Sequence, residues 1–252
     1  MRNLCIAFVA AAILLSWSGT ADAVTYGTLT ATWGGVDAST EVHYVNSPMN
    51  DGSIYVGRYK LTGTVQTWVE GVTPAAPLLL GGSLPIYCID TYQWANTGTT
   101  TYAVTDLADG PLGNGAPAMK AEKAVYLRDL IYHYYGLASD PATKAVFAAA
   151  VWEIVYEPIG SWNVASGNVL ETGWSTTQLN LASTWLGSLH YHDHGNTAYA
   201  LLSSGYQDFA VAVGSGGHSD GYEIPEPLTL LAVFGGVTGV GGYIRRRKLA
   251  LA

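Results

Sequence analysis

Residues 140–158 read DPATKAVFAAAVWEIVYEP, and this stretch decides the fold. Asp140 can cap the start of a helix, Pro141 suits the first helical turn, and Pro158 cannot continue a helix. The residues between them are apolar nearly all round, which is typical of a helix buried on every side. We therefore expect a central helix around which the rest of one domain packs.

Two further helices are expected beside this one. Residues 117–135 start with Pro117 and repeat apolar side chains at helical spacing, and Gly136 follows as a stop. Residues 178–189 also carry apolar side chains on one face.

Most of the remaining chain has strand character, because short runs rich in Thr, Val and aromatic residues are separated by turn clusters. The expected strands are 25–33, 41–45, 54–62, 64–69, 86–90 and 100–104, then 206–213 after the helices, with 197–202 as a short turn. This order predicts an α+β fold, in which an antiparallel β-rich domain carries a three-helix insertion before its last strand.

The composition excludes several classes of protein. The 252 residues are 49% hydrophobic and 12% charged, which excludes a disordered chain. The net charge is −8, so we expect no nucleic-acid partner, which would need clustered positive charge. No GxSxG, HExxH, Walker or Rossmann motif occurs, and the sequence predicts neither an enzyme nor a cofactor.

The N-terminus is typical of a secretory signal peptide rather than an uncleaved anchor. Arg2 gives a positive start, and residues 5–15 form an apolar run too short to span a bilayer comfortably. Ala21 and Ala23 have the small-x-small pattern that signal peptidase accepts. We expect the general secretion machinery to export the chain and signal peptidase to remove residues 1–23.

The C-terminal tail has three parts in a fixed order. They are Pro225-Glu226-Pro227, the apolar run 228–244, and the cations Arg245, Arg246, Arg247 and Lys248. A helix over the apolar run would be about 25 Å long, the short end of a membrane span, and the cations would hold its end in the cytoplasm. The body, residues 24–213, is then expected outside the inner membrane, followed by a flexible spacer at 214–224.

This tail resembles the PEP-CTERM sorting signal of Gram-negative bacteria, also catalogued as an ice-binding-protein C-terminal motif. The resemblance implies that an exosortase, an integral membrane transpeptidase-like enzyme, recognises Pro-Glu-Pro and removes the tail. It also implies delivery to the cell surface or the extracellular matrix. We therefore expect a non-enzymatic exported surface or matrix protein, with a plain single-span membrane anchor as the alternative.

Three patches of the body resemble PEP-CTERM surface proteins and, more distantly, the thioester domains of Gram-positive adhesins. They are Tyr87-Cys88-Ile89-Asp90, the helical residues 148–157, and residues 206–211. In the thioester family a strand cysteine bonds to a glutamine side chain on the Trp-containing helix, and the thioester captures a nucleophile on the target. Aligned on Trp152, that glutamine position falls at Ala148, which has no acyl group. The resemblance thus marks Cys88 and Ala148 as vestigial thioester positions.

Cys88 is the one cysteine that remains once Cys5 leaves with the signal peptide, so no internal disulfide can form. Its apolar neighbours predict a buried, slowly reacting thiol with a raised pKa. Gln93, Gln178 and Gln207 are among the glutamines away from the matching helix position. Methylamine uptake by the native protein would show that another glutamine, such as Gln207, has taken over the role.

If the scaffold has lost its chemistry, Asp90, Trp152 and Glu153 are structural. Trp152 should fill the core, and the two acids should bind backbone N–H groups or Arg128. The alternative function is an adhesin or glycan-binding module on a degenerate thioester scaffold, with extracellular polysaccharide as its partner.

The one metal-like cluster in the sequence consists of His190, His192 and His194 around Asp193, with His133 and His218 as distant histidines. Alternating histidines on an extended segment can place two imidazoles on one side. A Gly-Asn turn follows directly, so we expect a solvated loop with at most weak metal binding. A metal-dependent hydrolase built on these histidines is a third hypothesis.

Overall fold

The computed structural model of the chain describes residues 25–44, 53–69, 82–112, 115–195 and 197–213. The predicted signal peptide, spacer and sorting tail lie outside these residues. All of the described residues lie within the predicted body, residues 24–213.

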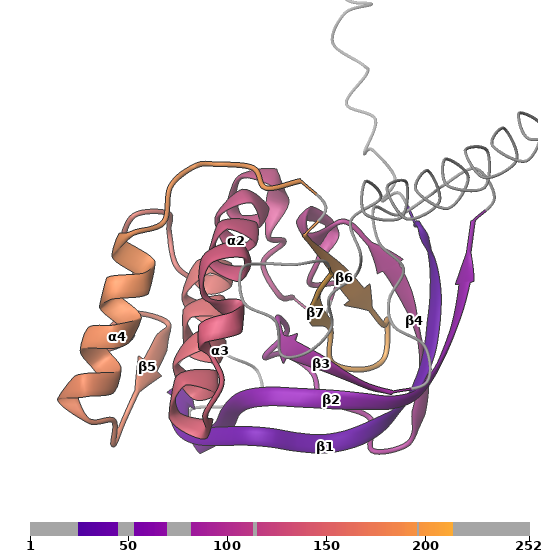
Figure 1. The fold of residues 1–252 in the computed structure, drawn as a ribbon, viewed down its shortest axis with the longest axis horizontal. Helices are drawn as coiled ribbons and strands as arrows, with labels where there is room; N and C mark the ends of the chain where they lie inside the picture. The colour runs from indigo at the N-terminus through magenta and orange to yellow at the C-terminus, as the bar shows by residue number, and fades with distance from the viewer. Residues whose placement is uncertain (1–24, 45–52, 70–81, 113–114, 196, 214–252) are drawn as a thin grey trace, which may run out of the picture.

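Within the described residues, seven strands form one antiparallel sheet in the order β2-β3-β7-β6-β4-β1-β5 (Figure 1). Their bounds are β1 Gly27–Tyr44, β2 Ser53–Trp68, β3 Ser83–Cys88, β4 Thr99–Thr105, β5 Val169–Glu171, β6 Ala198–Leu202 and β7 Phe209–Ala212. β1 also pairs with β2, so the sheet closes on itself. β5 pairs with the C-terminal end of β1, at Val42–Tyr44.

The two longest strands each join two runs that the sequence separates. β1 runs through Gly34 and Gly35, and the register with β2 shifts between Trp33 and Val36. Gly35 has a φ of +94°, a conformation that favours glycine. Opposite this irregular stretch, a Cβ on Gly57 would lie 1.3 Å from the Ala38 carbonyl oxygen. Glycines therefore let the strand bend without ending.

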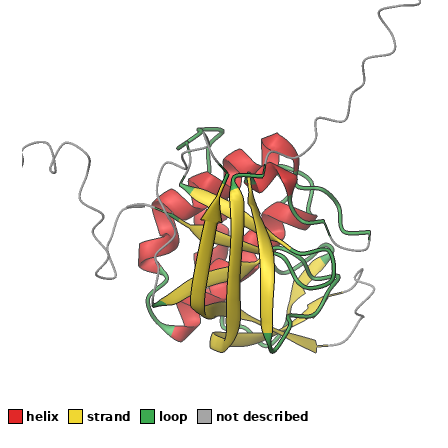
Figure 2. Ribbon diagram, turned by 90° about the vertical axis from the view of Figure 1, so that its right-hand side faces the viewer, coloured by secondary structure: helices red, strands yellow, loops and turns green. Residues whose placement is uncertain are grey.

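Three α-helices in the described part of the chain lie together on one side of the sheet (Figures 1 and 2). They are α2 Lys120–Tyr134, α3 Pro141–Tyr156 and α4 Thr176–Gly187, with short 3-10 helices η1 Leu107–Asp109 and η2 Tyr135–Leu137. α3 contacts β1, β2, β3 and β5 as well as both other α-helices. The predicted central helix is confirmed, and so is the α+β class.

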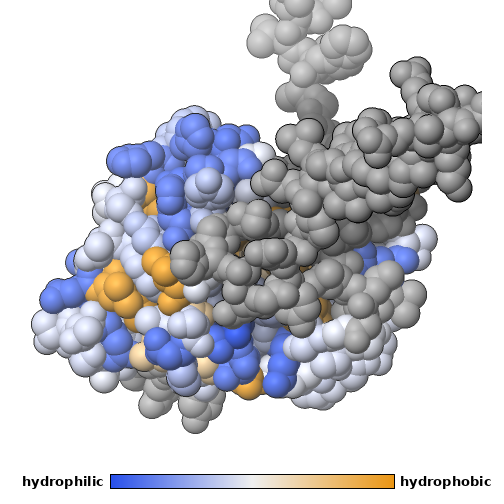
Figure 3. All heavy atoms as spheres, in the orientation of Figure 1, coloured by the Kyte–Doolittle hydropathy of each residue, from blue (hydrophilic) through white to orange (hydrophobic). Residues whose placement is uncertain are grey.

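The core is built around α3 and the concave side of the sheet. The largest fully buried side chains include Trp152 and Phe147 from α3 and Tyr102, Tyr199 and Phe209 from the strands. The described part of the face in Figure 3 is mainly hydrophilic or neutral, with a small hydrophobic patch over its helical side. Burial of apolar surface therefore accounts for most of the packing between helices and sheet.

Two parts of the predicted topology are wrong. The helices do not precede a single last strand, because β5 lies between α3 and α4 and both β6 and β7 follow α4. Residues 197–202 are not a turn, because Ala198–Leu202 form strand β6. All five residues of β6 are buried, so the strand lacks the polar alternation by which a half-buried strand is recognised.

The helix boundaries differ from the prediction by a few residues. α2 begins at Lys120, whose φ of +63° separates the helix from Pro117. α4 begins at Thr176, two residues before the predicted start. Ser175 caps the helix by accepting the backbone N–H of Gln178, and the Gln178 side chain accepts the backbone N–H of Ser175. This reciprocal capping box is a start signal that apolar periodicity does not contain.

The cap of α3 provides a test of the central helix. The Asp140 carboxylate accepts the N–H groups of Ala142 and Thr143. Asp140→Ala should lower the free energy of unfolding by about 1 kcal/mol, because it leaves these N–H groups without a protein partner. Urea denaturation measures the change. Asp140→Asn keeps an acceptor and should cost clearly less; equal losses in the two variants would contradict this role for the cap.

Candidate functional site

Strand β3 ends against the central helix α3, and side chains of the helix bind its last carbonyls. The indole N–H of Trp152 donates to the Cys88 carbonyl oxygen at 2.9 Å. The Tyr156 hydroxyl donates to the Ile89 carbonyl at 3.0 Å and accepts the N–H of Thr91 at 2.8 Å. These bonds fix the backbone on both sides of the cysteine, and Trp152 fills the core as expected.

The Cys88 thiol is buried, as the sequence predicts, with 2% of the residue exposed. Its sulfur donates to the carbonyl oxygen of Asp90 at 3.1 Å. Burial raises the pKa of the Cys88 thiol well above its usual value, and the nearby Asp90 acts in the same direction.

The side-chain amide of Gln207 shares a hydrogen-bond acceptor with this thiol. Gln207 Nε2 donates to the same Asp90 carbonyl oxygen at 3.0 Å. The Cys88 sulfur and the Gln207 amide nitrogen are therefore both within hydrogen-bond distance of one oxygen atom. The backbone N–H of Gln207 donates to Trp94 O at 3.1 Å, and 8% of Gln207 is exposed. A thiol and a carboxamide thus converge at the edge of the core.

Strand register explains this convergence. Tyr87 pairs with Ala210 and Cys88 pairs with Phe209 in the antiparallel β3–β7 ladder. The N–H of Ile89 then donates to the Asp208 carbonyl at 3.1 Å. Continuing the same register places Asp90 opposite Gln207. The first and third patches of the thioester resemblance are therefore neighbouring strand ends.

The other glutamines and Ala148 have different surroundings. Ala148 is buried in α3 and offers no group that could acylate a thiol. Gln178 belongs to the cap of α4, and Gln93 is buried near Asp90. The resemblance puts the acyl-donor position on the helix, at Ala148, and leaves Gln207 as a substitute donor; the sequence does not show that Cys88 and Gln207 share one acceptor. The sequence predicts both segments, 86–90 and 206–213, as strands, but it does not show that the two strands pair.

Two buried carboxyls flank the strand ends. Asp90 accepts the N–H of Tyr92 at 2.7 Å, and Asp208 accepts the N–H groups of Ser203 at 2.6 Å and Leu112 at 2.7 Å. Burial raises the pKa of Asp90, and it raises the pKa of Asp208 to about 7. These bonds position the turn that carries Gln207.

The backbone partners expected for the two structural acids are confirmed, but Arg128 is not one of them. Glu153 accepts the N–H of Asn163 at 2.8 Å, as Asp90 accepts that of Tyr92. Arg128 instead pairs with Asp106 at 2.5 Å. Arg128, which belongs to α2, also lies 3.7 Å from Asp193. The guanidinium therefore ties α2 to the segment after β4 rather than serving the core acids.

The predicted histidine cluster divides in the structure. His190 and His192 are exposed in the loop after α4, and His218 lies outside the described residues. His194 instead lies against α2, where its Nε2 is 2.6 Å from Asp129 Oδ1. Asp129 was absent from the sequence-based set because nothing local links it to a loop 65 residues later.

Comparisons of the chain with family models, curated proteins and solved structures found no match. Within the described residues, none of the helices has the length and apolar character needed to cross a membrane. The predicted span, 228–244, lies outside those residues.

A cluster of three buried glutamates, Glu153, Glu157 and Glu171, lies where α3 meets β5. Glu153 is fully buried there, Glu157 accepts the N–H groups of Asn168 and Val169, and neither carboxyl oxygen of Glu171 has a hydrogen-bond partner among the described residues. Burial raises the pKa of Glu153 to about 8, and the charge of Glu157 adds to the shift. Burial raises the pKa of Glu171 to about 9, with a smaller contribution from Glu153. Both acids are therefore protonated in the fold at neutral pH.

These two acids predict an unusual pH dependence of stability. In the unfolded chain a glutamic acid loses its proton near pH 4.3, whereas Glu153 and Glu171 keep theirs in the fold. Between about pH 5 and 8 the native state therefore binds more protons, and the free energy of unfolding falls as pH rises, by up to about 1.4 kcal/mol per pH unit for each proton. Urea titrations across this range measure the slope.

Glu171→Gln removes one of these protonation sites and should flatten that slope. Glu122→Gln, an exposed acid on α2, is the matched control and should leave it unchanged. Stability that rises from pH 5 to 8, or an unaltered slope in Glu171→Gln, would show that these carboxyls are ionised in the fold.

Proposed function

We propose that the chain is an exported bacterial surface protein whose body is a covalent attachment module, with an internal thioester between Cys88 and Gln207. The observation that carries the proposal is the convergence of the Cys88 thiol and the Gln207 amide on one carbonyl oxygen. The resemblance of residues 87–90 and 206–211 to thioester domains supports it from the sequence side. The module acts once per chain, so it is an adhesive and not an enzyme.

In the proposed bond-forming step, the Cys88 sulfur attacks the side-chain carbonyl carbon of Gln207. The carbon–sulfur bond forms, the carbon–nitrogen bond breaks, and the thiol proton leaves with the amide nitrogen as ammonia. No oxidant or cofactor is needed. Because the buried thiol has a raised pKa, the reaction depends on the closeness of the two groups rather than on a large thiolate population.

In the proposed capture step, a primary amine on a target surface attacks the same carbonyl carbon. An amide forms between the target and the Gln207 side chain, and Cys88 returns as a free thiol. The position of Gln207 suits this role, because its partner Trp94 is 67% exposed and its neighbour Tyr206 is 43% exposed. These aromatic side chains offer a surface on which a target can settle beside the reactive carbon.

This proposal differs from the sequence-based expectation in one respect. Placing the acyl donor at Ala148 makes the scaffold degenerate, whereas placing it at Gln207 makes the reaction possible. The degenerate scaffold, which would bind polysaccharide or another surface without a covalent bond, is the alternative. Whether Cys88 is a free thiol or is bonded to Gln207 distinguishes the degenerate scaffold from the thioester.

Native full-length protein should take up one methylamine per chain and expose one new thiol, because the amine opens the thioester at Gln207. Mass spectrometry of peptides locates the added methylamine, and a thiol reagent counts Cys88. Cys88→Ala and Gln207→Ala should each abolish the uptake.

Gln93→Ala is the matched control, because Gln93 is another buried glutamine near Asp90. This variant should react as the wild type does. Native protein that ignores methylamine and yields its one thiol only after denaturation would favour the degenerate scaffold. Uptake that persists in Gln207→Ala would place the acyl donor elsewhere.

We propose further that residues 225–248 direct the protein through an exosortase, as the three-part tail suggests. In this proposal the apolar run 228–244 holds the exported chain in the inner membrane until cleavage, and the body is then released to the cell surface or matrix. The motif order and the four terminal cations support the proposal.

Replacing Pro225 and Glu226 by Ala should leave full-length protein in the inner membrane of the natural host, because the recognition sequence is gone. Immunoblots of membrane, surface and culture-medium fractions measure the distribution. The double variant Asp220→Ala, Glu223→Ala alters the spacer instead and should be processed normally. Normal release of the Pro225, Glu226 variant would defeat the sorting proposal, and an unprocessed wild type would indicate a plain membrane anchor.

A further inference from the structure

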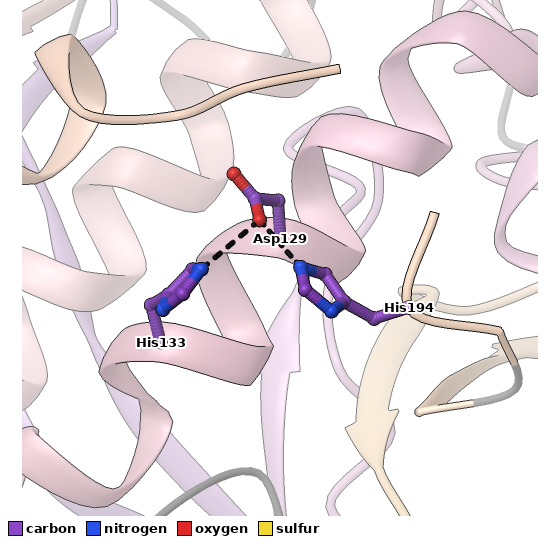
Figure 4. A group of neighbouring side chains, drawn as sticks. All are labelled: Asp129, His133 and His194. Atoms are coloured by element: carbon purple, nitrogen blue, oxygen red, sulfur yellow. Dashed lines mark hydrogen bonds and ion pairs between the residues drawn. The ribbon is translucent and has the colours of Figure 1, made fainter. Parts of the chain in front are cut away.

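We propose that Asp129, His133 and His194 form a binding site for a divalent transition metal of the zinc class. Figure 4 shows a ring nitrogen of each histidine directed at the same oxygen of Asp129. The three ligand atoms lie within 4.8 Å of one another. This site is separate from the Cys88–Gln207 pair and does not depend on the function proposed for that pair.

Two elements build the site. Asp129 and His133 stand four residues apart on α2, so both side chains lie on one face of the helix. His194 comes from the loop after α4. The backbone N–H of His190 donates to Asp129 Oδ2 at 2.8 Å, which leaves Oδ1 directed at the two rings. An outer hydrogen bond of this kind is how metal sites orient a carboxylate ligand.

The distances suit a small tetrahedral ion. Zinc binds imidazole nitrogen and carboxylate oxygen at about 2.0–2.1 Å, which places neighbouring tetrahedral ligands about 3.3 Å apart. His133 Nε2 lies 3.3 Å from Asp129 Oδ1. His194 Nε2 lies 2.6 Å from the same oxygen, so this ring must retreat by less than 1 Å to admit the ion. Its position on a loop permits that movement.

The charges around Asp129 also favour a cation. The side chain of Asp129 is only 2% exposed, and its ion-pair partners among the described residues are His133 and His194. The neighbouring Arg128 is directed at Asp106 and Asp193 instead. A buried carboxylate needs compensation, and a divalent ion held between Asp129 and the two imidazoles would provide it.

The surroundings leave a route and a free coordination position. The side chain of His133 is 48% exposed, so an ion can enter from solvent and keep a water as its fourth ligand. The ring of Tyr132 stacks on His194 with centroids 3.9 Å apart and an interplanar angle of 7°, which fixes the plane of that imidazole. A bound ion would clamp the loop to α2.

The ligand types select the class of metal. Two imidazoles and one carboxylate suit zinc, cobalt, nickel and copper, whereas calcium and magnesium prefer sites built from oxygen alone. Zinc and cobalt are therefore the probes of choice, because cobalt reports tetrahedral geometry through its visible absorption.

The test is zinc titration of the full-length chain, prepared without a histidine tag and stripped of metal with a chelator. Calorimetry should give one saturable zinc site per chain, and zinc should raise the melting temperature. His133→Ala and His194→Ala should each weaken zinc binding at least tenfold. Cobalt should show intense visible bands in the wild type and lose them in both variants.

His190→Ala is the matched control, because it removes an exposed imidazole from the same loop and keeps the backbone N–H that binds Asp129. It should bind zinc within twofold of the wild type. The proposal is wrong if folded wild-type protein, checked by circular dichroism, shows no saturable zinc site. It is equally wrong if His190→Ala weakens binding as much as His194→Ala, which would indicate adventitious binding by surface histidines.

Discussion

The hydrogen bond from the Trp152 indole to the Cys88 carbonyl connects the central helix to the strand end on which the site depends. One turn further along α3, Tyr156 binds the next stretch of the same backbone. A helix apolar enough to be buried all round can bind a strand end only through such side-chain groups, since its own backbone groups are already paired. The position of Cys88 therefore depends on the packing of α3.

The sequence predicts the structure correctly where local chemistry decides it. The α3 segment carries its own cap, first-turn proline and terminating proline, so Asp140, Pro141 and Pro158 bound it without tertiary information. The strands are harder to predict from the sequence, because the glycines that bend β1 look like a break between two strands. β6 was missed since a strand buried on both faces has no polar alternation to reveal it.

The site was harder to predict for the same reason. Cys88 and Trp152 were found because each lies in a distinctive local sequence, and both are buried as expected. The position of Gln207 near Cys88 follows only from the register of β3 against β7, which no local pattern of residues 206–211 contains. Asp129 and His194 likewise meet only because α2 and the loop after α4 pack together. Long-range pairing is a property of the fold and not of any segment.

The central claim is that Cys88 and Gln207 are chemically joined in the native protein. The most direct measurement is the intact mass of full-length protein, purified without amines and compared with the Gln207→Ala variant. The account predicts a wild-type mass one ammonia below the sequence value, with Gln207→Ala at its full calculated mass. A wild type at its full calculated mass, with a free Cys88 thiol, would contradict the account.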